Sequence, residues 1–369
     1  DLSAAGVITD GGDAATDITA TALALRATSG IGSGDALETA VSTLAADNAT
    51  SNDIRIENQL TPSGTLTVGQ VSLVGGGTLD GVTNAGGSIL ITNASPVTVT
   101  QEVQASGGGD VTLAAEGTAA DDDLTIDANV SASGGAGNIN LYAGGDILLG
   151  DTATPSVSAG GSGAVSLYAG QDSDAGVLAG SWNAAGDITM AESTSASSVD
   201  GSMTLDAPDH IQIAVVDADS DSAGTVGNVT VTAGGAISDA TTTTEGIDGI
   251  TGNLVTLTAA TGIGAAGDAD IDTTAATLAV SNSASGAVVI SEADDVTVRQ
   301  IDQDGAGAVT LTTTAGGIVI DDNTGGIANA ITATSGTVTL SAGGADSDVT
   351  FHDSLATRAD GSGSVMAAD

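Results

Sequence analysis

The sequence predicts an all-β protein: a parallel β-helix, or β-solenoid, whose coils of about 26 residues carry loop insertions. Three observations support this fold class. A short strand pattern recurs along the chain, its copies are regularly spaced, and the composition suits a narrow core. A unit of this size cannot bury its own apolar face, whereas stacked copies can.

The recurring pattern alternates apolar and polar residues and ends at glycines. Residues 138–145 read Asn-Ile-Asn-Leu-Tyr-Ala-Gly-Gly, and residues 228–235 read Asn-Val-Thr-Val-Thr-Ala-Gly-Gly. Such alternation places every second side chain on one face of a half-buried strand. We expect the threonines between core positions to face outward and to pair between coils. The expected inward pairs are Ile139/Leu141, Val229/Val231, Val255/Leu257 and Val309/Leu311.

The spacing of the copies supports stacking. The copies that begin at Val229 and Val255 are 26 residues apart, and larger gaps elsewhere are interpreted as loops inserted at the corners of coils. A longer duplication is also visible, because Leu25–Gly32 matches Leu257–Gly264. The match continues at an offset of 234 positions in the segments 43–48 and 277–282. Duplication on this scale indicates an array of interchangeable coils.

Composition agrees with a narrow solenoid core. The chain has 54 Gly, 4 Pro and 1% aromatic residues, whereas an ordinary globular core uses more large side chains. Disorder is the alternative for so much Gly, Ser and Asp, but the hydrophobic fraction of 41% and the alternating pattern argue against it. We expect residues 1–20 to be an irregular entry segment. Residues 21–369 should form one continuous β-solenoid that belongs to a longer chain or fibre.

Charge limits the partners. The chain has 47 acidic residues against four arginines and no lysine, for a net charge of −43. Such a surface repels nucleic acid phosphates and anionic membranes, so neither is an expected partner. Cysteine is absent, which excludes disulfides and thiolate metal sites. No stretch of the sequence is long and apolar enough to predict a membrane span.

The coils resemble the haemagglutinin-type repeats of filamentous haemagglutinin-like adhesins and other large bacterial surface proteins. The residues that carry the resemblance are 137–147, 227–237 and 257–264. The resemblance implies a right-handed parallel β-helix that serves as an extended shaft on the bacterial cell surface. No catalytic residues of that family carry over to this chain.

Alternate carboxylates suggest a calcium site. Asp217, Asp219 and Asp221 lie two residues apart, and such carboxylates can converge on Ca²⁺. They are the candidate metal ligands, although Ser222 stands where a complete calcium loop requires glycine. The alternative is a solvated acidic loop. A second run, 268–272, is a weaker candidate because Ile271 within it is expected to face inward.

The sequence does not predict an enzyme. His210 and His352 are isolated from any catalytic motif and are interpreted as corner or surface residues. Tyr142 and Tyr168 occupy matching positions, so we expect them to stack on the outer face as a structural ladder. A sugar-stacking platform is the alternative for this tyrosine pair.

The expected function is that of a non-enzymatic structural repeat module, or shaft, of a large extracellular bacterial surface adhesin or fibre. The alternative is a calcium-dependent binding module or one that self-assembles into filaments. Expected partners are neighbouring repeats, copies of the chain stacked end to end, and host or surface glycans. No cofactor is expected to be required, and Ca²⁺ is the candidate ion.

Overall fold

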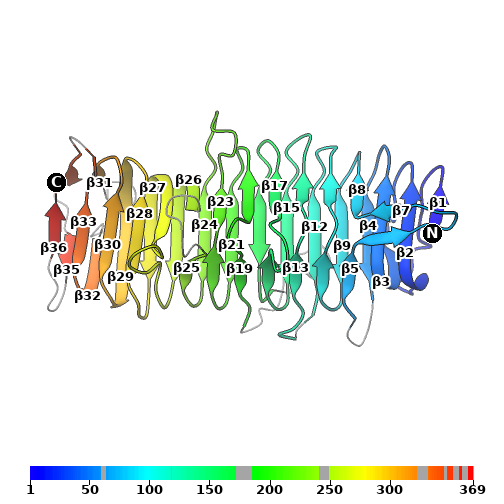
Figure 1. The fold of residues 1–369 in the computed structure, drawn as a ribbon, viewed down its shortest axis with the longest axis horizontal. Helices are drawn as coiled ribbons and strands as arrows, with labels where there is room; N and C mark the ends of the chain where they lie inside the picture. Colours follow the sequence, from blue (N-terminus) through cyan, green and yellow to red (C-terminus); the bar gives the residue numbers. More distant parts are fainter. Residues whose placement is uncertain are drawn as a thin grey trace. The chain divides into compact units, whose positions relative to one another are not determined.

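A computed structural model describes residues 1–59, 64–117, 119–171, 185–240, 249–321, 331–344 and 347–351, with the backbone of 357–359 and 365–368. The described part of the chain contains β-strands and no helix (Figure 1). Accordingly, none of its elements meets the length and hydropathy that a membrane-crossing helix needs. The chain divides into two compact units, Asp1–Ser202 and Met203–Asp369.

The first unit contains strands β1 to β20. Their bounds are β1 Leu2–Ala4, β2 Ile18–Ala27, β3 Leu37–Asn48, β4 Ile54–Asn58, β5 Leu66–Val68, β6 Gln70–Ser72, β7 Thr78–Asp80, β8 Val82–Asn84, β9 Ile89–Asn93, β10 Val97–Val99, β11 Val103–Ala105, β12 Val111–Ala115, β13 Leu124–Ile126, β14 Val130–Ala132, β15 Ile139–Ala143, β16 Ile147–Leu149, β17 Ser156–Ala159, β18 Val165–Tyr168, β19 Ile188–Met190 and β20 Ser195–Ser198.

The second unit contains strands β21 to β36. Their bounds are β21 Met203–Ala207, β22 Ile211–Ile213, β23 Val215–Asp217, β24 Val229–Ala233, β25 Ile237–Asp239, β26 Gly249–Ala259, β27 Ile271–Asn282, β28 Val288–Glu292, β29 Val296–Ala306, β30 Val309–Thr313, β31 Ile318–Ile320, β32 Ile331–Ser335, β33 Val338–Ser341, β34 Val349–Phe351, β35 Thr357–Ala359 and β36 Val365–Ala368.

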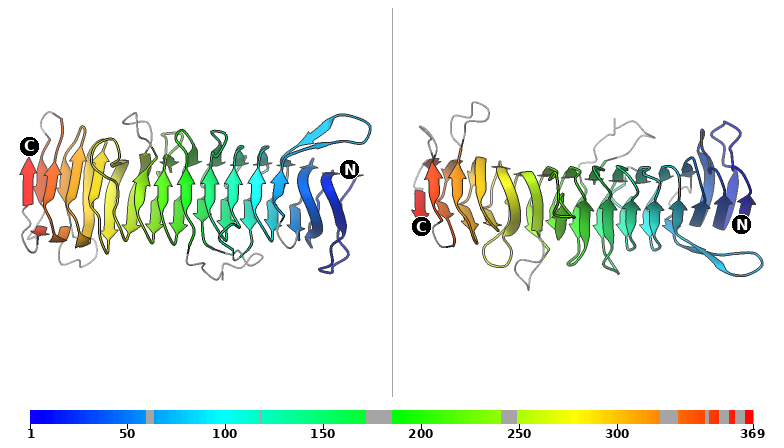
Figure 2. Two further views of the ribbon diagram at one scale, coloured as in Figure 1. Left: turned by 60° about the horizontal axis from the view of Figure 1, so that its bottom comes forward. Right: turned by 90° about the horizontal axis from the view of Figure 1, so that it is seen from above.

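Parallel ladders run through the first unit. Strands β9, β12, β15 and β18 pair in sequence order, as do β10, β13, β16 and β19, and likewise β11, β14 and β17 with β20. Each strand therefore pairs with the third strand after it, which is the connectivity of a helix with three strands per coil. The ribbon of this unit winds accordingly (Figure 2).

The second unit is also built from parallel ladders, although its long strands β26, β27 and β29 each pair with a strand nearer in sequence. Strands β21, β24, β26 and β27 form one parallel ladder, and β28, β30, β33 and β36 form another. Strands β29, β31 and β34 belong to a third. The predicted β-solenoid is therefore confirmed within each unit, while the continuity of a single solenoid over residues 21–369 stays a prediction.

Strand pairing also reaches into residues 1–20. Strand β1 pairs in parallel with β2 through Leu2 and Leu25, and Ile8 forms a parallel bridge with Ile31. Part of the expected entry segment thus lies in the ladder of the first coils.

The core consists of apolar side chains stacked in register. In the first unit Val111, Ile139 and Val165 lie in successive coils, and all three are fully buried. In the second unit Val229 and Val255 do the same. All four expected inward pairs are fully buried, which confirms the alternating pattern as the source of the core. Half-buried threonines stack outside them, as Thr204, Thr230 and Thr256 do.

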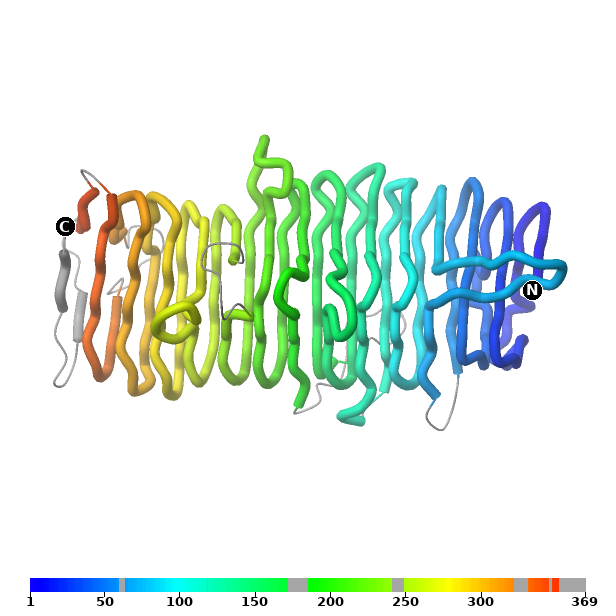
Figure 3. The backbone as a smooth tube through the Cα atoms, viewed as in Figure 1, coloured from blue at the N-terminus to red at the C-terminus, as the bar shows by residue number. Residues whose placement is uncertain are grey.

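A hairpin of the first unit departs from the coil pattern. Strands β6 and β7 pair antiparallel around a turn at Gly75, Gly76 and Gly77, whose φ angles are 100°, 102° and 89°. The hairpin lies across the outside of β2 and β3 (Figure 3). Val71 packs there on Ala24 and Ala45, so this outward face of the coils is covered.

Candidate functional site

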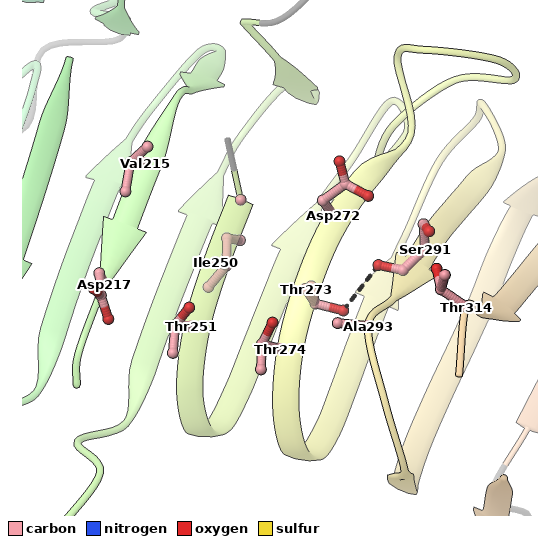
Figure 4. A pocket seen from close by; sticks show the side chains of 11 residues that line it. Val215, Asp217, Ile250, Thr251, Asp272, Thr273, Thr274, Ser291, Ala293 and Thr314 are labelled. Carbon is pink, nitrogen blue, oxygen red and sulfur yellow. Dashed lines mark hydrogen bonds between the residues drawn. The ribbon is translucent and has the colours of Figure 1, made fainter. Parts of the chain in front are cut away.

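A hollow on the outside of the second unit is the candidate binding surface. Its volume is about 460 Å³, and it lies over β23, β26, β27 and the residues around β28 (Figure 4). Asp217, Thr251 and Thr274 form one row across it, because their strands pair in that register. The residues that line it are Val215, Asp217, Gly249, Ile250, Thr251, Asp272, Thr273, Thr274, Ser291, Ala293 and Thr314.

A glycine occupies an outward position in the lining of the hollow. Gly249 pairs with Val215 on one side and lies against Asp272 on the other, and it contributes no side chain between them. A Cβ atom added to Gly249 would come within 2.9 Å of the Asp272 carbonyl oxygen. The neighbouring Ile250 and Thr273 are buried, so the floor beneath the hollow is closed.

A smaller hollow of about 240 Å³ adjoins the first, and the two share Thr251 and Thr274. Asp219, Asp294 and Asp295 add their carboxylates to its lining. Among the described residues that line the two hollows, none is basic, aromatic or a histidine. The surface therefore offers carboxylate and hydroxyl oxygens, which suit hard cations and sugar hydroxyls.

Two of the three predicted metal ligands line this surface, and the three remain apart. Asp217 lines the larger hollow and Asp219 the smaller, while Asp221 lines neither. One oxygen of Asp217 accepts a hydrogen bond from the Asp219 amide at 2.9 Å, and Asp221 accepts one from the Ala223 amide at 2.9 Å. The three side chains do not bring oxygens within 4.8 Å of one another. Calcium binding by this run stays a prediction. In the second run, Ile271 is buried as expected.

Glu292 is a buried acid beneath this surface that sequence reasoning missed. Its side chain is fully buried at the end of β28. Its oxygens accept hydrogen bonds from the Thr273 hydroxyl at 2.7 Å and from the backbone amides of Ala275 and Ala293 at 3.1 Å each. Burial raises the pKa of the Glu292 carboxyl to about 7, against the partial compensation of the Thr273 hydrogen bond.

A raised carboxyl pKa is typical of general acids, but Glu292 does not face the hollow. It lies on the inward side of β28, and the half-buried Ser291 lines the hollow instead. Without access to a ligand, a carboxyl cannot exchange a proton with it. We therefore read Glu292 as part of the packing. The sequence signal that points to this residue is the internal duplication, in which Glu292 corresponds to Asn58 at the offset of 234 positions.

The tyrosine pair stacks as predicted. Tyr142 and Tyr168 are partners in adjacent strands, with ring centroids 5.3 Å apart and ring planes at 11°. Tyr142 is only 6% exposed, and burial, followed by Tyr168, raises its pKa to about 12. One ring of the pair is thus covered. This favours the structural reading over a sugar platform, which needs open ring faces.

The histidine predictions have separate outcomes. His210 Nδ1 accepts a hydrogen bond of 3.0 Å from the Ala236 amide, so His210 holds a corner between adjacent coils as expected. His352 lies outside the described residues.

No family model, curated protein or solved structure matches this chain.

Proposed function

We propose that this chain is a non-enzymatic structural module, a β-solenoid shaft of a large extracellular bacterial surface adhesin or fibre. Its partners are neighbouring repeats or further copies of the chain, with host or surface glycans as the ligands of the whole assembly. The resemblance to filamentous haemagglutinin-type repeats supports the location and the role.

One observation carries the proposal: polar side chains at the corners are used to join one coil to the next. Asp123 accepts a hydrogen bond of 2.8 Å from the Asp146 amide, and Asp146 accepts one of 2.8 Å from the Asp187 amide. In a second series, Asp110 accepts a hydrogen bond of 2.7 Å from the Asn138 amide, and the Asn138 side-chain oxygen accepts one of 2.9 Å from the Ala164 amide. These carboxylate and amide oxygens satisfy backbone donors that would otherwise lie open at the turns.

The same arrangement recurs at other corners. Asp53 accepts from the Ser88 amide at 2.9 Å, and Asp295 in the second unit accepts from the Gly317 amide at 2.7 Å. A protein that assigns its carboxylates to coil joints is suited to bearing load along its ladders. The remaining surface carboxylates keep such a shaft soluble, and their negative charge disfavours side-by-side association of two copies.

Stretching single molecules tests the proposal. Attached by its two ends, a shaft should resist force and then lengthen in repeated steps of about one coil, near 26 residues each, as ladders are peeled apart. Removing a joint with Asp146→Ala should lower the force of one step, whereas Asp146→Asn keeps the accepting oxygen and should not. Smooth extension at negligible force in the wild type would contradict a shaft.

A second candidate function is calcium-dependent binding at the two hollows of the second unit, favoured by the five carboxylates that line them. Titration calorimetry with Ca²⁺ distinguishes this candidate from a pure shaft. A saturable heat that disappears in Asp217→Asn/Asp219→Asn would support it, whereas equal heats in wild type and variant would reject it.

A further inference from the structure

Three carboxylates of the first unit converge at a place that the sequence pattern did not single out. Asp10 and Asp17 lie on the segment between β1 and β2, and Glu38 is the second residue of β3. Each contributes an oxygen, and these oxygens all lie within 4.8 Å of one another. This cluster is separate from the hollows of the second unit, and it stands independently of the shaft proposal.

Glu38 is the buried member of the cluster, and its environment is incomplete. Its side chain is only 3% exposed, and its Oε2 atom is buried without a hydrogen-bond partner. Burial is also the main cause that raises the pKa of its carboxyl. A buried carboxylate oxygen without a donor is costly, so a positive partner is expected at this position.

The surroundings add negative charge. The carboxylates of Asp13 and Glu57 act on the cluster and favour its protonated forms. Asp10 and Asp17 each place a carboxylate oxygen within 4.8 Å of the other. Like charges at this separation repel, and a cation between them relieves the repulsion.

The backbone holds the three groups in place. The Asp17 amide donates to the Glu38 carbonyl oxygen at 2.9 Å, which fixes the end of the segment against β3. The Gly12 amide donates to Asp10 Oδ2 at 2.5 Å, and Gly12 has a φ of +87° that turns the chain back toward the cluster. The site is therefore shaped by more than the exposed acids alone.

The donor set indicates the ion. All three ligands are carboxylates, and hard cations such as Ca²⁺ prefer oxygen donors. Two oxygens on opposite sides of Ca²⁺, each about 2.4 Å away, are about 4.8 Å apart. We propose that Asp10, Asp17 and Glu38 bind one Ca²⁺ ion, which fastens the segment 5–17 onto the first coils. Water and nearby backbone carbonyls complete the coordination.

Calcium binding to the full chain tests this site. Equilibrium dialysis against Ca²⁺ in 150 mM NaCl would compare wild type with Glu38→Gln and Asp17→Asn. Asp13→Asn is the matched control, because it removes the same charge from the same segment and its oxygen can still accept from the Ala15 amide. We expect the number of saturable sites to fall by one in both site variants and to stay unchanged in the control.

Thermal unfolding provides a second readout, in which the variant that loses calcium binding is not expected to lose stability in the absence of calcium. In EDTA, Glu38→Gln should melt at or above the wild-type temperature, because it removes an unpartnered buried charge. Added Ca²⁺ should raise the melting temperature of the wild type by more than it raises that of the variant. Unchanged stoichiometry in Glu38→Gln, or an equal loss in Asp13→Asn, would overturn the proposal and assign the cluster to proton sharing.

Discussion

Residues 37–58 of the first unit and residues 271–292 of the second are built to one plan, 234 positions apart, and end on different buried polar residues. Strands β3 and β27 are each 12 residues long, and β4 and β28 are each 5. The turns that precede them also agree, because Gly32 and Gly264 have φ angles of 60° and 65°. A Cβ atom at either glycine would lie 2.3 Å from a backbone oxygen, so the tight turn requires glycine in both units.

One buried amide is common to both segments. Asn48 is fully buried, and its oxygen accepts from the Gly30 amide at 2.7 Å, as the oxygen of Asn282 does from the Gly262 amide at 3.0 Å. Their amide nitrogens donate to turn carbonyls at matching positions, Ser51 and Asn52 for Asn48 and Ser285 and Gly286 for Asn282. The duplication therefore copied a polar joint along with the apolar core.

The difference lies at Asn58 and Glu292. Asn58 accepts from the Thr39 hydroxyl and the Val41 amide, both at 2.9 Å. It also donates to the Val41 carbonyl oxygen at 3.0 Å and to the Asn93 side-chain oxygen at 2.9 Å. Glu292 takes the two matching donors, from Thr273 and Ala275, but an ionised carboxylate has no hydrogen to give.

This contrast teaches that one solenoid position accepts either an amide or an acid, at different costs. The amide completes its hydrogen bonds at any pH. The acid is accommodated best when protonated, as its raised pKa of about 7 indicates. The first unit should therefore be insensitive to pH at this joint, and the second should weaken as pH rises. Hydrogen exchange on peptides from each segment reads the two units separately.

The largest expected effect comes from placing an acid in the first unit. Asn58→Asp sets a carboxylate oxygen against the Val41 carbonyl oxygen and the Asn93 side-chain oxygen, which are both acceptors. We expect a loss of about 4 to 5 kcal/mol in the free energy of unfolding at pH 8. The loss should be smaller at pH 5, where a protonated Asp regains one donor.

Urea denaturation with hydrogen exchange on residues 37–58 measures this loss. Asn129→Asp is the matched control, because Asn129 is exposed and its accepting oxygen, bonded to the Ser156 amide at 3.0 Å, survives the change. Equal stability of the two variants would mean that the Asn58 joint does not hold the first unit together.

Matched core positions should respond alike, in contrast to the polar joint. Leu25 and Leu257 correspond in the duplication, and both are fully buried. Leu25→Ala and Leu257→Ala should each cost about 3 to 4 kcal/mol by leaving a cavity. If the two losses in the free energy of unfolding differed by more than about 2 kcal/mol, the two units would share a backbone plan but not equivalent core packing.

Removing the acid from the second unit should have the opposite sign. The carboxyl of Glu292 has a folded pKa of about 7 against an ordinary value of 4.5. Below the ordinary value both states are protonated. As pH rises toward 7 the unfolded chain ionises first, so the free energy of unfolding falls, by about 3 kcal/mol once pH exceeds the folded pKa.

Glu292→Gln has the same length and no charge, so it should be more stable than wild type by about 3 kcal/mol at pH 8 and equal to it near pH 4. Parallel stability curves for wild type and variant between pH 4 and 8 would refute an ionisable joint. Glu57→Gln, at a half-buried position beside Asn58, controls for the loss of one negative charge in an acidic chain.

The core residues could be predicted from the sequence, whereas the buried polar residues that link coils could not, and the reason is physical. Alternation reports which side chains are apolar, so Val229 and Val231 were placed inside correctly. Asn58 and Glu292 end their strands, where polar residues ordinarily mark exposed corners. The hairpin of residues 70–80 has the same alternation as a coil, and only its three glycines distinguish it.

The candidate sites were harder to predict than the fold. Asp217, Asp219 and Asp221 share the spacing of a calcium loop, yet Asp217 and Asp221 bind nearby amides. Asp10 and Glu38, by contrast, are far apart in the sequence and meet only because the segment before β2 returns to β3. The spacing of nearby acids in the sequence indicates turns, whereas the meeting of acids that are distant in the sequence depends on how the coils stack.

The smallest expected effect concerns the partners of the shared amide. Asn48 donates to the Asn84 oxygen at 2.8 Å, and Asn282 donates to the Gln303 oxygen at 2.8 Å. Asn84 also donates to Asn52 and Ser88 carbonyls and accepts from the Gly86 amide, whereas Gln303 donates once, to the Gly286 carbonyl.

Asn84→Ala should therefore cost about 2 kcal/mol and Gln303→Ala about 1 kcal/mol, since each leaves buried partners unpaired in proportion to its bonds. Hydrogen exchange at the Gly30 and Gly262 amides would compare them. Faster exchange in the Gln303 variant than in the Asn84 variant would contradict this ranking of the two joints.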